Sequence, residues 1–594
     1  MSETVKNRIE ALRSFMRREQ LHAFIVPSSD IHLSEYPSEH WKSREWISGF
    51  TGSAGTIVVT LDKAGLWTDS RYFLQAEKEL TGSGICLFKD RLPETPSIAE
   101  WLSNTLSAGE VVGLDGTVNS ARDVLALQQV LQAKNLTLNT ASDPFAEIWT
   151  DRPPVPMNPV FGLPEQIAGK SVSEKIAEIN SQLNKLAADS LLIASLDTVA
   201  WLFNLRGNDV EYNPVFISFA YVSAAETVLF IFPEKIDTDI INYLKKEGVV
   251  VAHYSKIVDY INQLNGKTIC LQGDKISYSL YHHTETHNKI KDTISPADLL
   301  KAQKNETELS GFRSAMQKDG VALVRFFRWL EEAVPLGNVT EHSVAEKLVE
   351  FRSQQDLFVG ESFGTIAGFQ GNGAIIHYHA DKQHASKIAN EGFLLIDSGA
   401  QYFDGTTDIT RTVALGPLSE EMKKDYTLVL KGNIALASAV FPAGTRGTQL
   451  DVLARQFLWK EKVNYLYGTG HGIGHFLNVH EGPQSIRMEE NPVKLEKGMI
   501  LSNEPGVYRT GKYGIRIENL MTIREEESDC GYGIFYNFET LTLCPIDTTP
   551  VVTEMMNKQE IDWLNEYHQK VFELLSPGLT TDETEWLKAK TSPL

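Results

Sequence analysis

The chain is poor in cysteine, and its few cysteines are not arranged as a framework. Among 594 residues there are four, Cys86, Cys270, Cys530 and Cys544, and none forms a CxxC pair. The first three lie far apart along the chain. We therefore expect no disulfide framework, which fits a reducing compartment such as the cytoplasm.

Positive charge is also scarce. The chain has 56 lysines and arginines against 77 aspartates and glutamates, a formal net charge of -21. Binding to nucleic-acid phosphates requires clustered lysine and arginine, so we exclude nucleic acid as a partner. The negative charge favours solubility and cationic ligands such as metal ions or peptide amino termini.

Long hydrophobic runs are missing as well. The charged segment 1–20 has a helical pattern but lacks the apolar core of a signal peptide. The most apolar stretch, residues 215–232, contains Glu226 and serines. It predicts two buried strands joined around residues 223–225 and not a membrane span. We expect a cytoplasmic protein that does not associate with membranes.

Two features divide the chain into three domains. Five prolines between residues 151 and 164 exclude a helix or a central strand and indicate a boundary. A second boundary lies near Ala302, where Asn305 and Glu308 form a capping-box pattern before an apolar helical periodicity. We therefore place the domains at 1–152, 165–303 and 304–594.

The first two domains look like divergent copies of one unit. Each begins with an amphipathic helix, at 9–18 and at 176–186, and continues with an apolar strand, at 23–26 and at 191–194. In both, a tryptophan then precedes a glycine, and further apolar strands follow. Alternation of helices and strands predicts an α/β fold for each copy.

The third domain carries pairs of carboxylates at strand ends. An apolar strand at 393–396 ends at Asp397, and after a turn a second strand carries Asp408. A hairpin would bring the two carboxylates together. Ionised carboxylates held together away from solvent repel, so they need protons or cations. A polar surface hairpin is the alternative interpretation.

Further along, a histidine and two glutamates have similar settings. His471 lies among closely spaced glycines, which allow close backbone approach. A dinucleotide-binding loop is the alternative, but that motif must open a helix directly after a strand. Glu504 ends an apolar strand, and Glu518 shares a strand face with Arg516. A plain ion pair between Arg516 and Glu518 is the alternative there.

Together these segments offer four carboxylates and one imidazole. Such a set suits hard or borderline divalent ions such as Mn²⁺, Co²⁺ or Fe²⁺, and not a structural zinc. Four carboxylates are enough to bridge two ions. A two-metal site binds a hydroxide at neutral pH and polarises a carbonyl, which is what amide hydrolysis requires.

The order and spacing of these segments resemble those of a known family. IIHY, IDSG, DGTTDITRT, GTGHGIG, NVHEGP, NEPG and GIRIEN are similar to the pita-bread metallopeptidases, in the branch that contains aminopeptidase P and prolidase. WISGFTGSAGT, LWTDSRYFLQA and AWLFNLRGNDVEYNPVF resemble the first two domains of three-domain, cytosolic aminopeptidase P. The resemblance covers nearly the whole chain. It implies two creatinase-type α/β N-terminal domains before a C-terminal, α+β pita-bread domain.

The resemblance implies an activity and a set of roles. The activity is removal of the first residue from peptides with proline in second position, by a homodimer using two divalent ions, Mn²⁺ in the first place and Co²⁺, Fe²⁺ or Zn²⁺ as alternatives. Metal would be bound by Asp397, Asp408, His471, Glu504 and Glu518. Among these, Asp408 and Glu518 would bridge the ions and Glu504 would also shuttle a proton.

Four other residues have implied roles outside the metal shell. His377 and His480 would contact the substrate carbonyl or its oxyanion. Arg516 would orient Glu518 and nearby groups, and Arg71 would reach the substrate from the N-terminal domain.

One position departs from the pattern of close relatives, and two rival functions stay open. Relatives often carry histidine at the position of Tyr467, so a substrate contact from that position is in doubt. A prolidase uses the same five ligands on dipeptides but usually has a single N-terminal domain. A non-catalytic pita-bread binding module would have lost ligands, and all five are present here. Proline specificity rests on the resemblance, because the sequence shows no proline pocket.

Other histidines invite different interpretations. The cluster of His282, His283, Glu285 and His287 could bind zinc, but a polar stretch of this kind is typical of a solvated surface. His379, His384 and His475 lie close to the site in sequence without matching functional positions, so we interpret them as neighbours.

Overall fold

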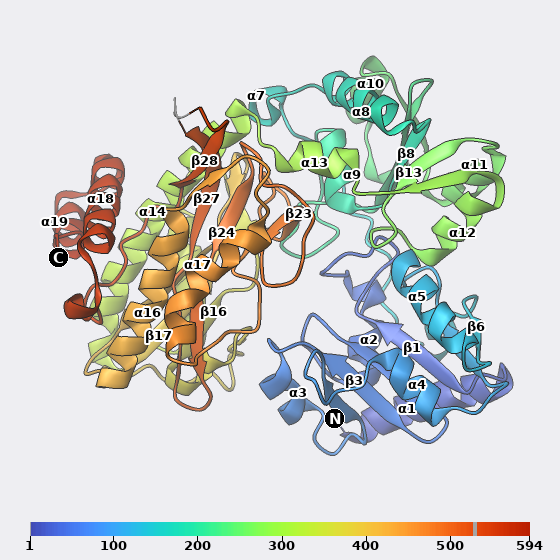
Figure 1. The fold of residues 1–594 in the computed structure, drawn as a ribbon, viewed down its shortest axis with the longest axis horizontal. Coiled ribbons are helices and arrows are strands. Elements are labelled where there is room, and N and C mark those ends of the chain that lie inside the picture. The colour runs from blue at the N-terminus through green and yellow to red at the C-terminus, as the bar shows by residue number, and fades with distance from the viewer. Residues whose placement is uncertain (1, 527–530) are drawn as a thin grey trace. The chain divides into compact units, whose positions relative to one another are not determined.

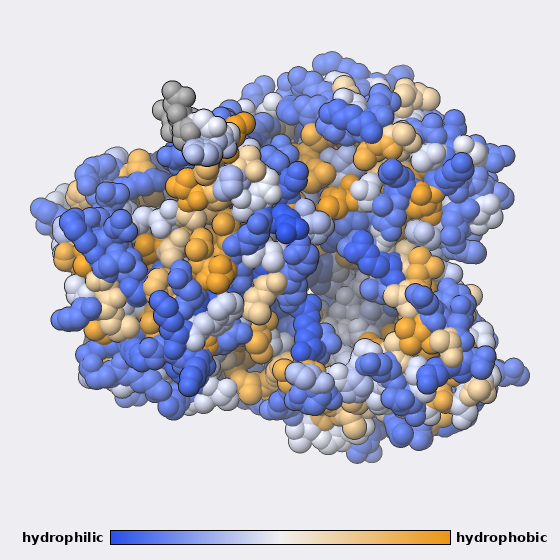
Figure 2. Space-filling view, in the orientation of Figure 1, coloured by the Kyte–Doolittle hydropathy of each residue, from blue (hydrophilic) through white to orange (hydrophobic). Residues whose placement is uncertain are grey.

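The computed structural model describes residues 2–526 and 531–594, which fold as two compact units (Figure 1). The first unit comprises Met1–Leu163 and Lys170–Ala297, and the second comprises Pro164–Gly169 and Asp298–Leu594. No helix in the described part of the chain is both long and apolar enough to cross a membrane. Hydrophilic side chains predominate on the face shown in Figure 2.

The first half of the first unit is built on a six-stranded mixed sheet. Its order is β4-β3-β2-β1-β5-β6, with β1 antiparallel to β2 and parallel to β5. The amphipathic helix α1 (Ser2–Arg18) packs Leu12 and Met16 into the core beside this sheet. The strands are β1 (Ala23–Pro27), β2 (Thr56–Thr60), β3 (Ala64–Thr68), β4 (Cys86–Lys89), β5 (Val111–Leu114) and β6 (Thr137–Asn139).

The second half of this unit repeats the same topology. Its sheet has the order β12-β11-β10-β8-β13-β14, and every neighbouring pair has the same parallel or antiparallel sense as its counterpart. A capping box from Ser171 and Glu174 starts α8 (Val172–Leu186), the counterpart of α1. The strands are β8 (Ser190–Ile193), β10 (Ser218–Ser223), β11 (Thr227–Ile231), β12 (Val249–His253), β13 (Thr268–Leu271) and β14 (Lys289–Asp292). The two strands predicted between residues 215 and 232 are thus β10 and β11.

The second unit contains the long helix α14 (Glu306–Ala333). Asn305 accepts from the Glu308 backbone and Glu308 accepts from the Asn305 backbone, so the capping box predicted there is confirmed. The helices α16 (Glu420–Ala437) and α17 (Gly447–Lys460) pack on each other, and α18 (Lys558–Leu575) packs on α16. Their shared core includes Val429, Leu458 and Leu564.

Several small sheets and one larger sheet lie beside these helices. The larger sheet has the order β21-β28-β27-β24-β22-β23, and β16-β17-β20 and β15-β18-β19 form two three-stranded sheets. The hairpin β25-β26 is separate. The strands are β15 (Phe358–Glu361), β16 (Ile366–Phe369), β17 (Phe393–Ser398), β18 (Ala400–Tyr402), β19 (Gly405–Thr406), β20 (Ile409–Ala414), β21 (Val440–Pro442), β22 (Gly470–Gly472), β23 (Glu481–Ile486), β24 (Ile500–Asn503), β25 (Gly506–Arg509), β26 (Tyr513–Arg516), β27 (Asn519–Glu526) and β28 (Phe535–Thr540).

The predicted hairpin around the two aspartates differs in detail. β17 and β20 pair antiparallel with Asp397 opposite Thr410, but the chain between them leaves this sheet to form β18 and β19. The excursion starts at Gly399, where a side chain would collide with Ser362 and the Thr407 carbonyl. Asp408 therefore lies just before β20 and not on a strand.

The predicted strand carrying Arg516 and Glu518 is also interrupted. β26 ends at Arg516 and β27 starts at Asn519, so Glu518 lies in the link between them. The backbone N–H of Glu518 donates to the carbonyl of Thr410 at 3.1 Å, which holds this link against β20.

The cysteines show no pairing within the described residues. Cys86, Cys270 and Cys544 are free thiols. Cys530 lies outside the described residues.

Candidate metal centre

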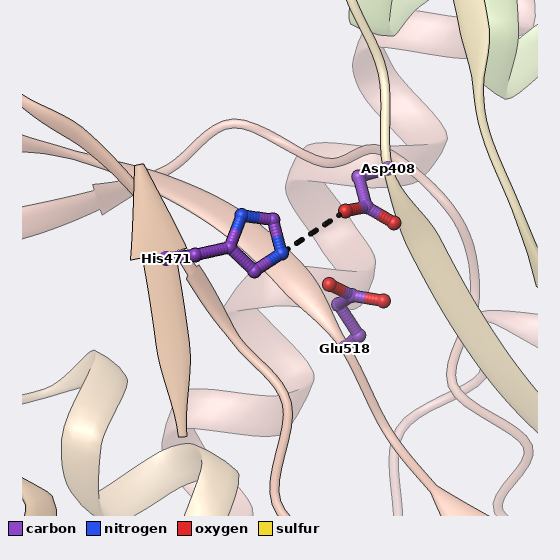
Figure 3. A group of neighbouring side chains, drawn as sticks. All are labelled: Asp408, His471 and Glu518. Carbon is purple, nitrogen blue, oxygen red and sulfur yellow. Dashed lines mark ion pairs between the residues drawn. The ribbon is translucent and has the colours of Figure 1, made fainter. Parts of the chain in front are cut away.

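Three of the predicted ligands converge from separate segments of the second unit. The donor atoms of Asp408, His471 and Glu518 all lie within 4.8 Å of one another. Figure 3 shows the His471 ring directed at the two carboxylates, and His471 Nε2 is 3.4 Å from Asp408 Oδ2. The segments before β20, on β22 and between β26 and β27 thus bring their polar side chains to one point.

The hydrogen bond on the far side of the His471 ring determines which nitrogen faces this point. Nδ1 lies 3.0 Å from the carbonyl oxygen of Gly472. Because a carbonyl only accepts, Nδ1 carries a proton, and Nε2 is the nitrogen that faces the carboxylates. Nε2 also lies 3.4 Å from Oε1 of Glu504. In the neutral tautomer that is protonated on Nδ1, Nε2 is the atom that can bind a metal ion.

Glu504 follows β24 directly and is held by its own strand. Its Oε1 accepts a hydrogen bond from Ser502 Oγ at 3.1 Å, and Ser502 Oγ accepts the backbone N–H of His471 at 3.0 Å. The Ser502 hydroxyl therefore fixes the spacing between Glu504 and the β22 backbone that carries His471.

Asp397 at the end of β17 completes the carboxylate set. Its Oδ2 pairs with Nη2 of Arg516, whereas its buried Oδ1 has no hydrogen-bond partner in the described part of the chain. Nε of Arg516 donates to Thr410 Oγ1 at 3.1 Å, and Thr410 Oγ1 donates to Glu518 Oε2 at 2.8 Å. Arg516 thus contacts one carboxylate directly and another through Thr410, so a plain Arg516–Glu518 ion pair is not the arrangement found.

The electrostatics show how strongly this arrangement needs cations. Burial raises the pKa of Asp408 well above its ordinary value, and the nearby charges of Asp397 and Glu504 raise it further. Burial, followed by the charges of Asp408 and Asp397, likewise raises the pKa of Glu518. Burial and the charge of Glu518 raise the pKa of Glu504 to about 8. Protons or divalent cations must neutralise such a cluster.

The residues fit a divalent metal on three independent counts. The cluster supplies buried carboxylates with raised pKa values, a buried oxygen of Asp397 without a hydrogen-bond partner, and an imidazole nitrogen, Nε2 of His471, that lies 3.4 Å from oxygens of both Asp408 and Glu504. This oxygen-rich donor set suits a hard or borderline divalent ion.

The two predicted substrate-contacting histidines, His480 and His377, lie in different settings. His480 stands edge-on to His471, with ring centroids 4.3 Å apart, and its charge acts on Asp408. His377 lies in the turn after the short 3-10 helix at residues 370–374, where its neighbour Tyr378 donates to buried Glu341 at 2.8 Å. The structure therefore places His480 beside the predicted ligands, and the roles of His480 and His377 stay predictions.

Arg71 belongs to the first unit. There its Nε and Nη2 donate to the two oxygens of Asp69 at 2.9 and 2.8 Å, and its guanidinium stands over the Tyr72 ring. This pairing orders the side chain, and its contact with substrate stays a prediction.

The alternative histidines do not form a metal site. His282 pairs with Glu285 and His283 contacts Asn262 on the exposed surface of α12 (Tyr278–His287). His379 is exposed, His384 pairs with Asp381, and His475 is buried beside Phe312. The Asp408–His471–Glu518 group is the only possible metal-binding group among the described residues.

The structure adds three hydroxyl groups that sequence reasoning did not assign. Thr410 links Arg516 to Glu518, Ser502 links Glu504 to the His471 backbone, and Tyr508 accepts a hydrogen bond from Arg516. No local pattern in the sequence indicates the hydrogen bond from Thr410 to Glu518.

Family models match the chain almost end to end. Two creatinase/prolidase N-terminal domain models match residues 8–148 and 151–308. The model of metallopeptidase family M24 matches residues 310–525, and the model of its C-terminal region matches 534–594.

Full-length relatives show the same relation. A protein of Coprinopsis cinerea named probable Xaa-Pro aminopeptidase P is 42% identical over 99% of this chain and 98% of its own length. Xaa-Pro aminopeptidase 1 of Dictyostelium discoideum is 40% identical over 99% of this chain and 97% of its own. The chain belongs to metallopeptidase family M24. The predicted family and enzyme class are thereby confirmed.

Solved structures support the same fold. The X-prolyl aminopeptidase of Caenorhabditis elegans, described as a cytosolic enzyme with a di-nuclear active site, is 34% identical and covers 100% of both chains with a TM-score of 0.96. An Xaa-Pro dipeptidase of Bacillus anthracis covers 64% of this chain and 99% of its own, with a TM-score of 0.51 and 23% identity. Two creatinase-type domains followed by a pita-bread metallopeptidase domain are therefore confirmed.

Proposed function

We propose that this protein hydrolyses the first peptide bond of peptides whose second residue is proline. The observation that carries the proposal is the similarity to the C. elegans X-prolyl aminopeptidase over the whole of both chains. The relatives from Coprinopsis and Dictyostelium support it, because they too are similar over nearly their full length. The donor set at the metal centre suits the same chemistry.

Two divalent ions would be held by the carboxylates and the imidazole described above. The proposed ligands are Asp397, Asp408, His471, Glu504 and Glu518, with Asp408 and Glu518 shared between the ions. An oxygen-rich set favours Mn²⁺, with Co²⁺, Fe²⁺ and Zn²⁺ as alternatives. When bound, such ions act as Lewis acids and lower the pKa of water.

The surrounding side chains would handle the substrate and the proton. An Xaa-Pro bond is a tertiary amide without an N–H, so its hydrolysis must protonate a secondary amine as it leaves. The carboxylate of Glu504 would accept a proton from the attacking water and pass it to that nitrogen. His480 and His377 would contact the carbonyl oxygen, Arg516 would hold Asp397 and Glu518 in place, and Arg71 would contact the substrate.

The family resemblance also supports a wider setting. We propose three domains at 1–152, 165–303 and 304–594, a homodimer, and a cytoplasmic location. The domain limits rest on the proline-rich segment and on the capping box that starts α14. The location agrees with the description of the C. elegans enzyme as cytosolic.

A cleavage panel tests the proposal. Chelated protein is assayed with and without Mn²⁺ on Arg-Pro-Pro, on an Xaa-Pro dipeptide and on Met-Ala-Ser, and we expect metal-dependent release of arginine from Arg-Pro-Pro. Cleavage of the dipeptide alone would indicate a prolidase. Metal-bound protein that cleaves none of the three would indicate a binding module. As a matched pair, His377→Ala should keep its metal and turn over slowly, whereas His379→Ala should be nearly normal.

A further inference from the structure

A line of hydrogen bonds leads away from the metal centre on the side of Arg516. Nη1 of Arg516 donates to the hydroxyl of Tyr508, which lies 2.8 Å from the hydroxyl of Tyr467. The Tyr467 hydroxyl donates in turn to the backbone carbonyl of Glu504 at 3.0 Å. The line therefore starts at the arginine that pairs with Asp397 and ends on the backbone of another proposed ligand.

Counting protons fixes the direction of this line. Each phenol has one proton to donate. Because Tyr467 gives its proton to the Glu504 carbonyl, Tyr508 must supply the proton between the two hydroxyls, and Tyr508 itself accepts from Arg516. Each hydroxyl thus donates once and accepts once in the same direction, an arrangement in which successive hydrogen bonds polarise and strengthen one another.

The local backbone is shaped to admit both phenols. A side-chain carbon at Gly506 would lie 2.6 Å from the Tyr467 hydroxyl and 2.8 Å from the Tyr508 hydroxyl, so the glycine leaves the space they occupy. Arg455 donates to the backbone carbonyl of Tyr467 at 2.7 Å, and the Tyr465 ring packs on the Tyr467 ring with centroids 4.9 Å apart. Tyr467 is therefore held from both its backbone and its ring.

We propose that Tyr467 is a positioning residue of the metal centre. Its hydroxyl ties the backbone of Glu504, after β24, to the Arg516–Asp397 pair at the end of β17, and so fixes the separation of two ligands carried by different sheets. The assignment rests on the proposed function, because it presumes that these carboxylates hold metal.

The test removes single hydroxyls and measures metal binding separately from turnover. Tyr467→Phe, Tyr508→Phe and the double variant are titrated with Mn²⁺ in competition with a chelator, and kcat and KM are measured on Arg-Pro-Pro. Tyr426→Phe is the matched control, because that buried tyrosine also donates to a backbone carbonyl, at Asp547 and 2.8 Å, outside the line. Comparable supporting contacts change metal affinity or activity by about 10- to 100-fold.

We expect each single variant to bind Mn²⁺ about 10- to 100-fold more weakly than the control, with a larger change in kcat than in KM. The double variant should bind Mn²⁺ no more weakly than the weaker-binding single variant, because either substitution alone breaks the line of hydrogen bonds. Wild-type Mn²⁺ affinity in Tyr467→Phe, or additive losses in the double variant, would overturn the inference. If Tyr467→Phe fails to fold, the Mn²⁺ affinity of Tyr508→Phe tests the inference instead, because that substitution breaks the same line of hydrogen bonds. Wild-type protein that binds Mn²⁺ but leaves Arg-Pro-Pro intact would refute the proposed function. The Mn²⁺ affinities of the variants would still test whether Tyr467 positions the metal ligands.

Discussion

Removing the metal should turn Glu504 into a group that binds a proton near neutral pH. Burial raises the pKa of this carboxyl to about 8 from an ordinary value of 4.5, and the neighbouring charge of Glu518 contributes in the same direction. His471 and Arg516 act against this rise without cancelling it. In metal-free protein at pH 7 the side chain should therefore be mostly protonated.

The difference between the folded and unfolded pKa of Glu504 determines how the free energy of unfolding of metal-free protein changes with pH. One pH unit corresponds to about 1.4 kcal/mol, so the rise from 4.5 to about 8 corresponds to about 5 kcal/mol. Because the folded pKa lies above the unfolded one, this contribution to the free energy of unfolding is fully present below pH 4.5. It is lost as the pH rises through about 8. In metal-bound protein the free energy of unfolding should not show this dependence on pH, because the carboxylate of Glu504 is then ionised and neutralised by cations.

The assay is proton release on metal binding. Mn²⁺ is added to metal-free protein in weakly buffered solution at pH 6.5, and wild type is compared with Glu504→Gln, which has no proton to lose at this position. We expect the variant to release about one proton fewer per chain than wild type. The apparent metal affinity of wild type should rise with pH up to about 8.

Two results would refute this reasoning. One is equal proton release by wild type and Glu504→Gln. The other is a metal affinity of wild type that does not change between pH 6 and the folded pKa of about 8. Either would mean that Glu504 is ionised in the metal-free fold.

Three further predictions concern single residues. Asp408→Ala should lose metal and nearly all activity, whereas His480→Ala should keep its metal and turn over roughly 10²–10³-fold more slowly; elemental analysis separates them, and metal loss in both would contradict the assignment. Arg516→Lys cannot reproduce the planar set of donors, so it should bind Mn²⁺ about 10- to 100-fold more weakly in chelator competition, and unchanged affinity would count against its role. Burial, with the charge of Arg411, lowers the pKa of His568 to about 4 from 6.5, so the free energy of unfolding should fall by about 3 kcal/mol as the pH drops across that interval. His568→Gln should flatten this part of a denaturant-derived stability profile, and a profile as steep as that of wild type would show that another group is responsible.

Much of the architecture could be predicted because its signals are local. The capping box of Asn305 and Glu308 starts α14 where the sequence places it, and the apolar run that ends at Asp397 is β17. Apolar runs and capping residues act over a few positions, so they can be recognised in the sequence alone. The ordered motifs around the five ligands are likewise sequence features, and they were enough to predict the family.

Only the tertiary structure decided how these groups meet. Arg516 pairs with Asp397, which is 119 positions away, and not with Glu518, which is two positions away. The reason is that the strand predicted to run through Arg516 breaks, and the Glu518 backbone then bonds to Thr410. The line from Arg516 through Tyr508 and Tyr467 depends in the same way on the packing of separate strands and loops. Contacts of this kind depend on how distant segments pack, and no local pattern of residues encodes that.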